Sequence, residues 1–157
     1  MGVTTTVVED VVTLNGELAE KTLDWYAQDV DGNVWYFGED TAEYEDGKKV
    51  GTHGSWEAGV DGALPGIIMN ADPQVNDAHR QEFYRGEAED MYWIVEANVT
   101  KEVPFGSFDD VIHTLEWSPV EPGVVGEKFY APGIGLIWER SLAGGRERFE
   151  LVGYRGP

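Results

Sequence analysis

The 157-residue chain contains no cysteine, so disulfides and thiolate chemistry are excluded. Any catalytic nucleophile must therefore be an oxygen or nitrogen group. No apolar run approaches the ~20 residues that a membrane-spanning helix needs, so we expect no membrane span. The chain also shows no basic-then-apolar leader, which fits a secreted or lipoprotein-derived segment without its signal; a cytoplasmic location is the alternative.

Basic residues are scarce: 11 Lys and Arg stand against 30 Asp and Glu, for a net charge of −19. Such a charge repels the phosphates of nucleic acids and the head groups of anionic lipids, so a nucleic-acid partner is not expected. It suits a cationic ligand, metal ions or plain solubility. Ten of the acids lie within residues 17–46, which hold a single base, Lys21.

Aromatic and β-branched residues are abundant, and 20 Gly and 7 Pro separate them into short runs typical of strands. The dipeptides Asn15-Gly16, Asp31-Gly32 and Asp46-Gly47 predict three successive hairpin turns, and hence an antiparallel meander. Later runs bring the expectation to nine to eleven strands. Residues 58–77, rich in Gly and Pro, are predicted to be a long irregular loop that gates a binding site.

These patterns predict a single all-β domain over residues 1–157. A meander of about ten strands must bury its aromatic faces and protect its edges. It can do so by closing into a lipocalin-like barrel or by forming a two-sheet sandwich, and the sequence leaves both arrangements open.

Long motifs resemble a family of uncharacterised bacterial proteins, commonly described as hypothetical proteins or lipoproteins. The segments are DWYAQD at 24–29, GNVWYFGE at 32–39, GSWEAGVDG at 54–62 and YAPGIGL at 130–136. The resemblance covers nearly the whole chain and implies an extracytoplasmic bacterial protein, but it implies no activity. Family members carry additional N-terminal strands, so this copy is expected to be shortened at that end.

Histidine and carboxylate side chains are the candidates for acid–base catalysis: His113, His79, Glu82 and Glu116. In a strand, residues three apart point to opposite faces. His113 and Glu116, or His79 and Glu82, therefore cannot form a dyad within one strand, and any such dyad must form across strands. A hydrogen-bonded structural histidine is the alternative reading.

Aromatic side chains on predicted strands are candidates for lining a ligand cavity. The candidates are Trp35, Tyr84, Trp93, Trp117 and Trp138. Rings beside carboxylates suit organic cations, whereas rings alone suit hydrophobic ligands. Most of the aromatic rings on predicted strands are expected to pack in an ordinary core, and lining of a ligand cavity is the alternative.

Asp29, Asp31 and Asn33 match the first three ligand positions of a calcium loop. The later positions that such a loop needs hold Val34 and Asp40, so a hairpin turn with solvated acids is the alternative. No motif in the chain requires a cofactor.

The leading hypothesis is a small-molecule-binding β domain with an aromatic-lined cavity for a hydrophobic or cationic organic ligand. Two alternatives stay open. One is a cofactor-free hydrolase or isomerase that uses a histidine and a carboxylate in the cavity, so whether the protein is an enzyme is undecided. The other is a calcium- or zinc-binding module.

Overall fold

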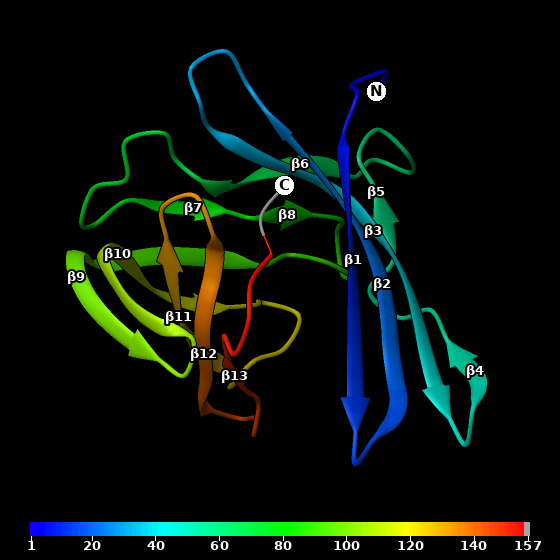
Figure 1. Cartoon of the computed structure of the whole chain (residues 1–157). Helices are drawn as coiled ribbons and strands as arrows, with labels where there is room; N and C mark the ends of the chain where they lie inside the picture. Colours follow the sequence, from blue (N-terminus) through cyan, green and yellow to red (C-terminus); the bar gives the residue numbers. More distant parts are fainter. Residues whose placement is uncertain (156–157) are drawn as a thin grey trace. The chain divides into compact units, whose positions relative to one another are not determined.

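Turn dipeptides and β-branched runs direct the first part of the chain into long strands, as the computed structural model of residues 1–155 shows (Figure 1). Asn15 and Gly16 both have positive φ, at 54° and 87°, and so do Asp46 and Gly47, at 50° and 71°. These are the conformations that a two-residue hairpin requires. The predicted meander over the first four strands is confirmed.

The described residues form thirteen strands in two antiparallel sheets and no helix. The strands are β1 (Thr6–Leu14), β2 (Glu17–Gln28), β3 (Val34–Glu45), β4 (Lys48–Gly51), β5 (Trp56–Glu57), β6 (Leu64–Met69), β7 (Ala78–Arg80), β8 (Glu82–Phe83), β9 (Met91–Val103), β10 (Gly106–Trp117), β11 (Val125–Ala131), β12 (Gly135–Ala143) and β13 (Arg148–Glu150). The all-β prediction is therefore confirmed. Neither sheet closes on itself, so the lipocalin-like barrel was wrong and the two-sheet alternative fits.

The first sheet has the order β1-β2-β3-β6-β8, with β4 and β5 also paired to β3. It belongs to a compact unit made of residues 1–71 and 80–89. The buried core of this unit gathers around two aromatic residues, Tyr36 and Trp56, with Ala58, Ala63 and Ala88. Strand β1 lies at one edge of the sheet, and all nine of its residues are exposed.

The second sheet has the order β13-β12-β11-β10-β9-β7. It forms most of the other unit, residues 72–79 and 90–157, described here to residue 155. One core cluster of this unit contains Val111, Phe129, Ala131 and Ile137. In register, His113 pairs with Phe129 and Phe129 with Trp138, so the three rings form one row across β10, β11 and β12.

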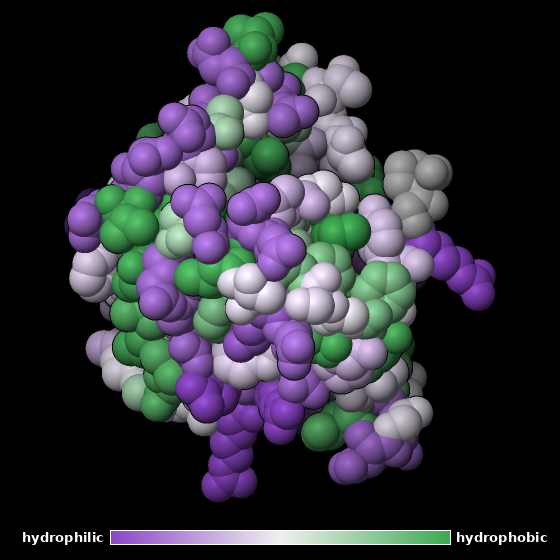
Figure 2. Space-filling view, turned by 60° about the vertical axis from the view of Figure 1, so that its left-hand side comes forward, coloured by the Kyte–Doolittle hydropathy of each residue, from purple (hydrophilic) through white to green (hydrophobic). Residues whose placement is uncertain are grey.

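The prediction of an irregular loop over residues 58–77 was wrong for the middle of this segment, where the chain forms β6. The sequence did not predict this strand because it contains Pro65 and Gly66. A Cβ at Gly66 would lie 2.3 Å from the carbonyl carbon of Gln81, so glycine is what allows the next chain segment to approach β6. In the view of Figure 2, hydrophilic residues are spread over the surface, with hydrophobic residues in groups between them. Among residues 1–155 there is no helix long and apolar enough to cross a membrane.

Candidate ligand-binding site

An open pocket of about 350 Å³ lies in the first unit, around Trp56 and the start of the loop that follows it. We call it the Trp56 pocket. Its lining residues come from β2, β3, β5, the segments on either side of β5 and the residue that follows β8: Trp25, Glu39, Asp40, Ser55, Trp56, Glu57, Val60, Asp61, Ala63 and Tyr84. The volume falls at the lower end of the range for small-molecule sites.

A β-bulge at Gly38 shapes this pocket. Asp24 pairs with Glu39 and Tyr26 with Tyr36, so β3 has one residue more than β2 between these two pairs. Gly38 has φ of +133°, and a Cβ there would lie only 2.2 Å from the carbonyl oxygen of Trp56. The glycine therefore permits β5 to approach β3, and it leaves room for the indole of Trp25 beside it.

The bulge also brings together three polar side chains that strict alternation would separate. The Tyr36 hydroxyl donates to Asp24 Oδ1 at 2.6 Å and lies 3.2 Å from Glu39 Oε2. A phenol has one proton, so it can donate to only one of these carboxylates at a time. The contact between Tyr36 and Glu39 is also a hydrogen bond when Glu39 carries a proton and donates it to the Tyr36 oxygen.

Burial is the main reason that Glu39 holds a proton so readily, and the nearby charge of Asp24 adds to it. Together they raise the pKa of Glu39 to about 7. Burial likewise raises the pKa of Asp24, although the hydrogen bond from Tyr36 opposes this. The pocket thus contains a carboxyl group that changes its charge near neutral pH.

Trp56 is fixed by contacts on two sides. Its Nε1 donates to Glu82 Oε2 at 2.9 Å, and its ring meets Tyr36 edge to face with centroids 5.4 Å apart. Only 5% of Trp56 is exposed. A buried indole held in this way forms a rigid wall rather than a side chain that must be ordered on binding.

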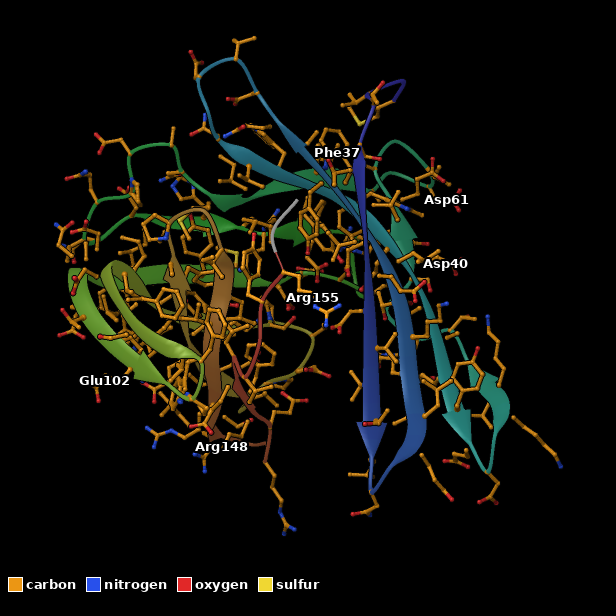
Figure 3. All side chains as sticks on the ribbon, in the orientation of Figure 1. Phe37, Asp40, Asp61, Glu102, Arg148 and Arg155 are labelled. Atoms are coloured by element: carbon orange, nitrogen blue, oxygen red, sulfur yellow. The ribbon has the colours of Figure 1, made fainter. Side chains whose placement is uncertain are left out.

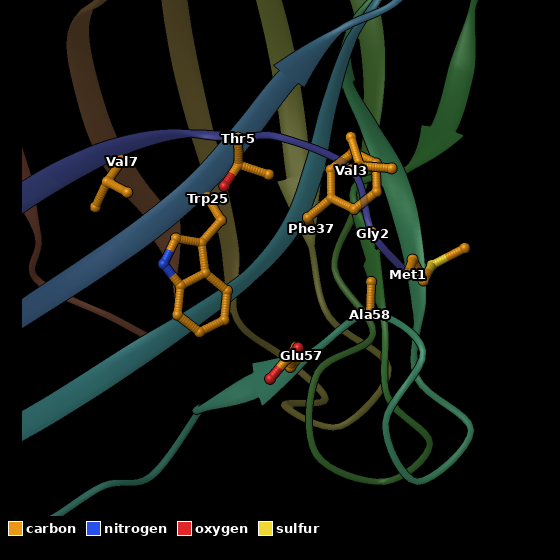
Figure 4. Close-up of a pocket in the computed structure, with 9 residues that line it drawn as sticks. All are labelled: Met1, Gly2, Val3, Thr5, Val7, Trp25, Phe37, Glu57 and Ala58. Atoms are coloured by element: carbon orange, nitrogen blue, oxygen red, sulfur yellow. The ribbon is translucent and has the colours of Figure 1, made fainter.

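Acidic residues dominate the charge of the pocket. Glu39, Asp40, Glu57 and Asp61 line it, and no lysine or arginine of the described chain does so. Figure 3 shows Asp40 on β3 and Asp61 on the loop after β5. A neighbouring pocket of about 260 Å³ shares Trp25 and Glu57 with it, and Figure 4 shows these two side chains beside the N-terminal segment.

His113, a predicted catalytic residue, lies in the second unit between two carboxylates. Its Nδ1 is 2.8 Å from Glu96 Oε2 and its Nε2 is 3.1 Å from Glu127 Oε2, while its ring stacks on Phe129 with centroids 4.2 Å apart. Both ring nitrogens thus contact carboxylates from the neighbouring strands, Glu96 on β9 and Glu127 on β11.

Glu116 contacts other partners than His113. Its Oε1 accepts from Thr114 and from Tyr130, each at 2.8 Å, and its Oε2 is 3.0 Å from Lys128 Nζ. Burial lowers the pKa of Lys128, but Glu116 and Glu139 outweigh burial and raise it. Glu116 therefore belongs to a separate ion-pair network of the second unit.

The remaining candidates are divided between the units. His79 is in the second unit, with its ring centroid 5.5 Å from that of Tyr92. Glu82 is in the first unit and accepts from Trp56. No histidine lines the Trp56 pocket among the described residues.

Only one of the five predicted ligand-binding aromatics, Tyr84, lines the Trp56 pocket. Trp35 donates from Nε1 to Asp29 Oδ2 at 2.8 Å. Trp138 meets Phe129 edge to face and has Lys101 Nζ 3.6 Å from its ring centroid. Trp93 and Trp117 are exposed on the second sheet.

The predicted calcium ligands form a hydrogen-bonded turn. Asp29 Oδ1 accepts from the backbone N–H groups of Asp31 and Asn33, and Oδ2 accepts from the side chains of Asn33 and Trp35. The Trp35 hydrogen bond, followed by that of Asn33, lowers the pKa of Asp29 to about 2. Within residues 1–155, no group of three or more His, Asp or Glu side chains is arranged to hold a metal ion.

The fold and the pocket thus define an all-β protein with an acidic, aromatic-walled site. Comparison with protein families, with curated proteins and with solved structures yields no match for this chain. Sequence reasoning missed Trp25, Glu39, Trp56 and Glu57 as site residues. The sequence does contain one indication of this site, which is Gly38 inside a predicted strand, because a glycine there often marks a bulge or a close backbone approach.

Proposed function

We propose that the Trp56 pocket binds a small organic cation, such as an alkylated amine. The observation that carries this proposal is the composition of the lining, which places three aromatic rings among four acidic side chains, of which Glu39 holds a proton most readily, with no basic side chain of the described chain. Aromatic faces attract cations through the ring quadrupole, and carboxylates supply the opposite charge. The net charge of −19 attracts a cation over longer distances.

Each part of the pocket has a role in this binding. Trp56 forms a rigid wall, because Tyr36 and Glu82 hold its ring in place. Trp25 is half-buried, so one part of its indole is accessible to a ligand. Asp40 and Asp61 are exposed, which leaves their carboxylates at the rim, where they can pair with an ammonium group.

A matched pair of probes tests the role of charge. Choline and its uncharged isostere 3,3-dimethylbutan-1-ol have nearly the same shape, and isothermal titration calorimetry or NMR titration compares their affinities. We expect choline to bind at least tenfold more tightly and to bind more weakly as salt is added. Equal binding of the two probes would contradict cation recognition, and no binding of choline would refute the proposal.

Variants locate the binding to the pocket. Trp25→Ala and the double change Asp40→Asn with Asp61→Asn each remove accessible groups, and we expect each to weaken choline binding at least fivefold. The matched control is Glu45→Gln with Asp46→Asn, which removes the same charge from an exposed turn outside the pocket. If the control weakened binding as much as the pocket variants, the attraction would come from net charge alone.

Glu39 favours a second candidate function, an acid–base enzyme acting in the same pocket. A general acid or base works best with a pKa near the operating pH, and that of Glu39 is about 7. Hydrolysis of chromogenic esters and glycosides, compared between the protein and Glu39→Gln, tests this. Loss of turnover in the variant would support it, and the absence of turnover, or turnover equal in both proteins, would count against it.

The bacterial family resemblance and the extracytoplasmic location remain predictions. Both agree with a domain that captures a solute outside the cytoplasm, and neither is needed for the argument from the pocket.

A further inference from the structure

Two tryptophans of the second unit are unusually exposed. Trp93 on β9 is 40% exposed and Trp117 on β10 is 36% exposed, whereas the other four tryptophans are buried or half-buried. Exposed indoles weaken solubility, so proteins keep few of them beyond what function needs. Their apolar faces and rigid rings suit them to binding surfaces.

The register places both indoles on one face of the sheet. Trp93 pairs directly with Leu115, and Trp117 lies two residues further along the same strand. Residues two apart in a strand share a face, so the two tryptophans are diagonal neighbours about 7–8 Å apart. Two flat apolar rings at this separation form a platform on an open sheet.

A row of charged side chains continues this face away from the tryptophans. Leu115 pairs with Glu127, Glu127 with Arg140, and Arg140 with Arg148. Arg140 donates through Nη2 to Glu127, and its side chain is 53% exposed. A guanidinium has five N–H donors, so Arg140 can bind further acceptors while it keeps this partner.

The charges on this face nearly balance. Glu127 contacts both His113 and Arg140, and Arg148 contacts Glu150 at 2.7 Å. This balance is unlike the rest of a chain whose net charge is −19. A balanced set of donors and acceptors complements a neutral ligand that carries many hydroxyl groups, and it gives no net attraction to an ionic one.

We propose that this face, centred on Trp93 and Trp117, binds a neutral oligosaccharide. Sugar rings have an apolar C–H face that stacks on an indole and hydroxyl edges that form hydrogen bonds. The two tryptophans receive the ring faces, while Arg140, whose side chain is exposed, donates to hydroxyl oxygens. This site is independent of the Trp56 pocket, so either proposal can fail without the other.

Affinity electrophoresis tests the proposal with hydroxyethylcellulose, xylan, mixed-linkage β-glucan and galactomannan, and with polygalacturonate as an acidic comparison. We expect at least one neutral polysaccharide to retard the protein. Titration with oligosaccharides of that polymer should then change tryptophan fluorescence. Retardation by none of the neutral polymers, or by polygalacturonate alone, would overturn the proposal.

Substitutions then identify the surface. We expect Trp93→Ala and Trp117→Ala each to lower the affinity at least tenfold, while circular dichroism and melting temperature confirm that the variants fold. Phe149→Ala is the matched control, since Phe149 is 41% exposed but pairs with Glu139, on the opposite face from Arg140. Unchanged binding in both tryptophan variants would overturn the proposal, as would sedimentation data showing that this face joins two copies of the chain.

Discussion

Glu39 should make the stability of the protein depend on pH in a direction unusual for an acidic side chain. Its pKa rises from 4.5 to about 7 on folding, because burial and the charge of Asp24 disfavour the ionised form. The folded state therefore binds the proton more tightly than the unfolded state does. The resulting stabilisation is complete below pH 4.5 and is lost as the pH rises through 7.

The magnitude follows from the same values. Each pKa unit corresponds to about 1.4 kcal/mol, so this carboxyl group changes the free energy of unfolding by about 3 kcal/mol across that range. Glutamine has the shape of the protonated acid and does not titrate. We therefore expect Glu39→Gln to match the unsubstituted protein at pH 4.5 and to exceed it by about 3 kcal/mol at pH 8.

Urea unfolding at a series of pH values between 4.5 and 8 measures this difference. The control Glu45→Gln removes the same charge from an exposed position at the end of β3, and so reports the effect of net charge alone. A constant difference between Glu39→Gln and the unsubstituted protein at all pH values would refute the reasoning. The reasoning would also be refuted if the difference in unfolding free energy between Glu45→Gln and the unsubstituted protein changed with pH as much as the difference for Glu39→Gln.

Two further predictions concern the supports of the site. Gly38→Ala should destabilise the protein by about 2–4 kcal/mol, because the new Cβ would clash with the Trp56 carbonyl oxygen and the residue has a φ of +133°. The control Gly62→Ala is also at positive φ, but nothing lies near its Cβ, so we expect it to lower the melting temperature less. Asp29→Asn should lower the melting temperature at pH 7, and the deficit should shrink as the pH falls from about 4 towards 2, where Asp29 of the unsubstituted protein is itself about half protonated. A deficit that stayed constant to pH 2 would show that the charge of Asp29 does not support the turn.

Local sequence signals predicted much of the fold. The turns at Asn15-Gly16 and Asp46-Gly47 determine the meander, because few other dipeptides adopt positive φ at both positions. Alternation also placed His113 and Leu115 on one face, and the register confirms this. By contrast, β6 was missed, since Pro65 and Gly66 resemble loop residues unless the close approach of Gln81 is known.

The candidate site was harder to predict, because it depends on register and on a bulge. Tyr36 and Glu39 are three residues apart, and regular alternation would place them on opposite faces. The extra residue at Gly38 turns both toward Asp24. Likewise, Glu96 reaches His113 across a shift in the pairing of β9 and β10. Sequence spacing alone cannot reveal such partners.

Strand β1 has a consequence for the behaviour of the protein in concentrated solution. Its outer edge pairs with no strand of residues 1–155, and Val7, Val8, Val11 and Val12 are exposed along it, which makes it a template for joining another strand. If two copies paired along the full length of β1 in antiparallel fashion, Asp10, the central residue, would lie opposite Asp10 of the second copy. Like charges directly opposite each other destabilise such a pair. One aspartate in the middle of the strand thus disfavours this full-length pairing of two copies.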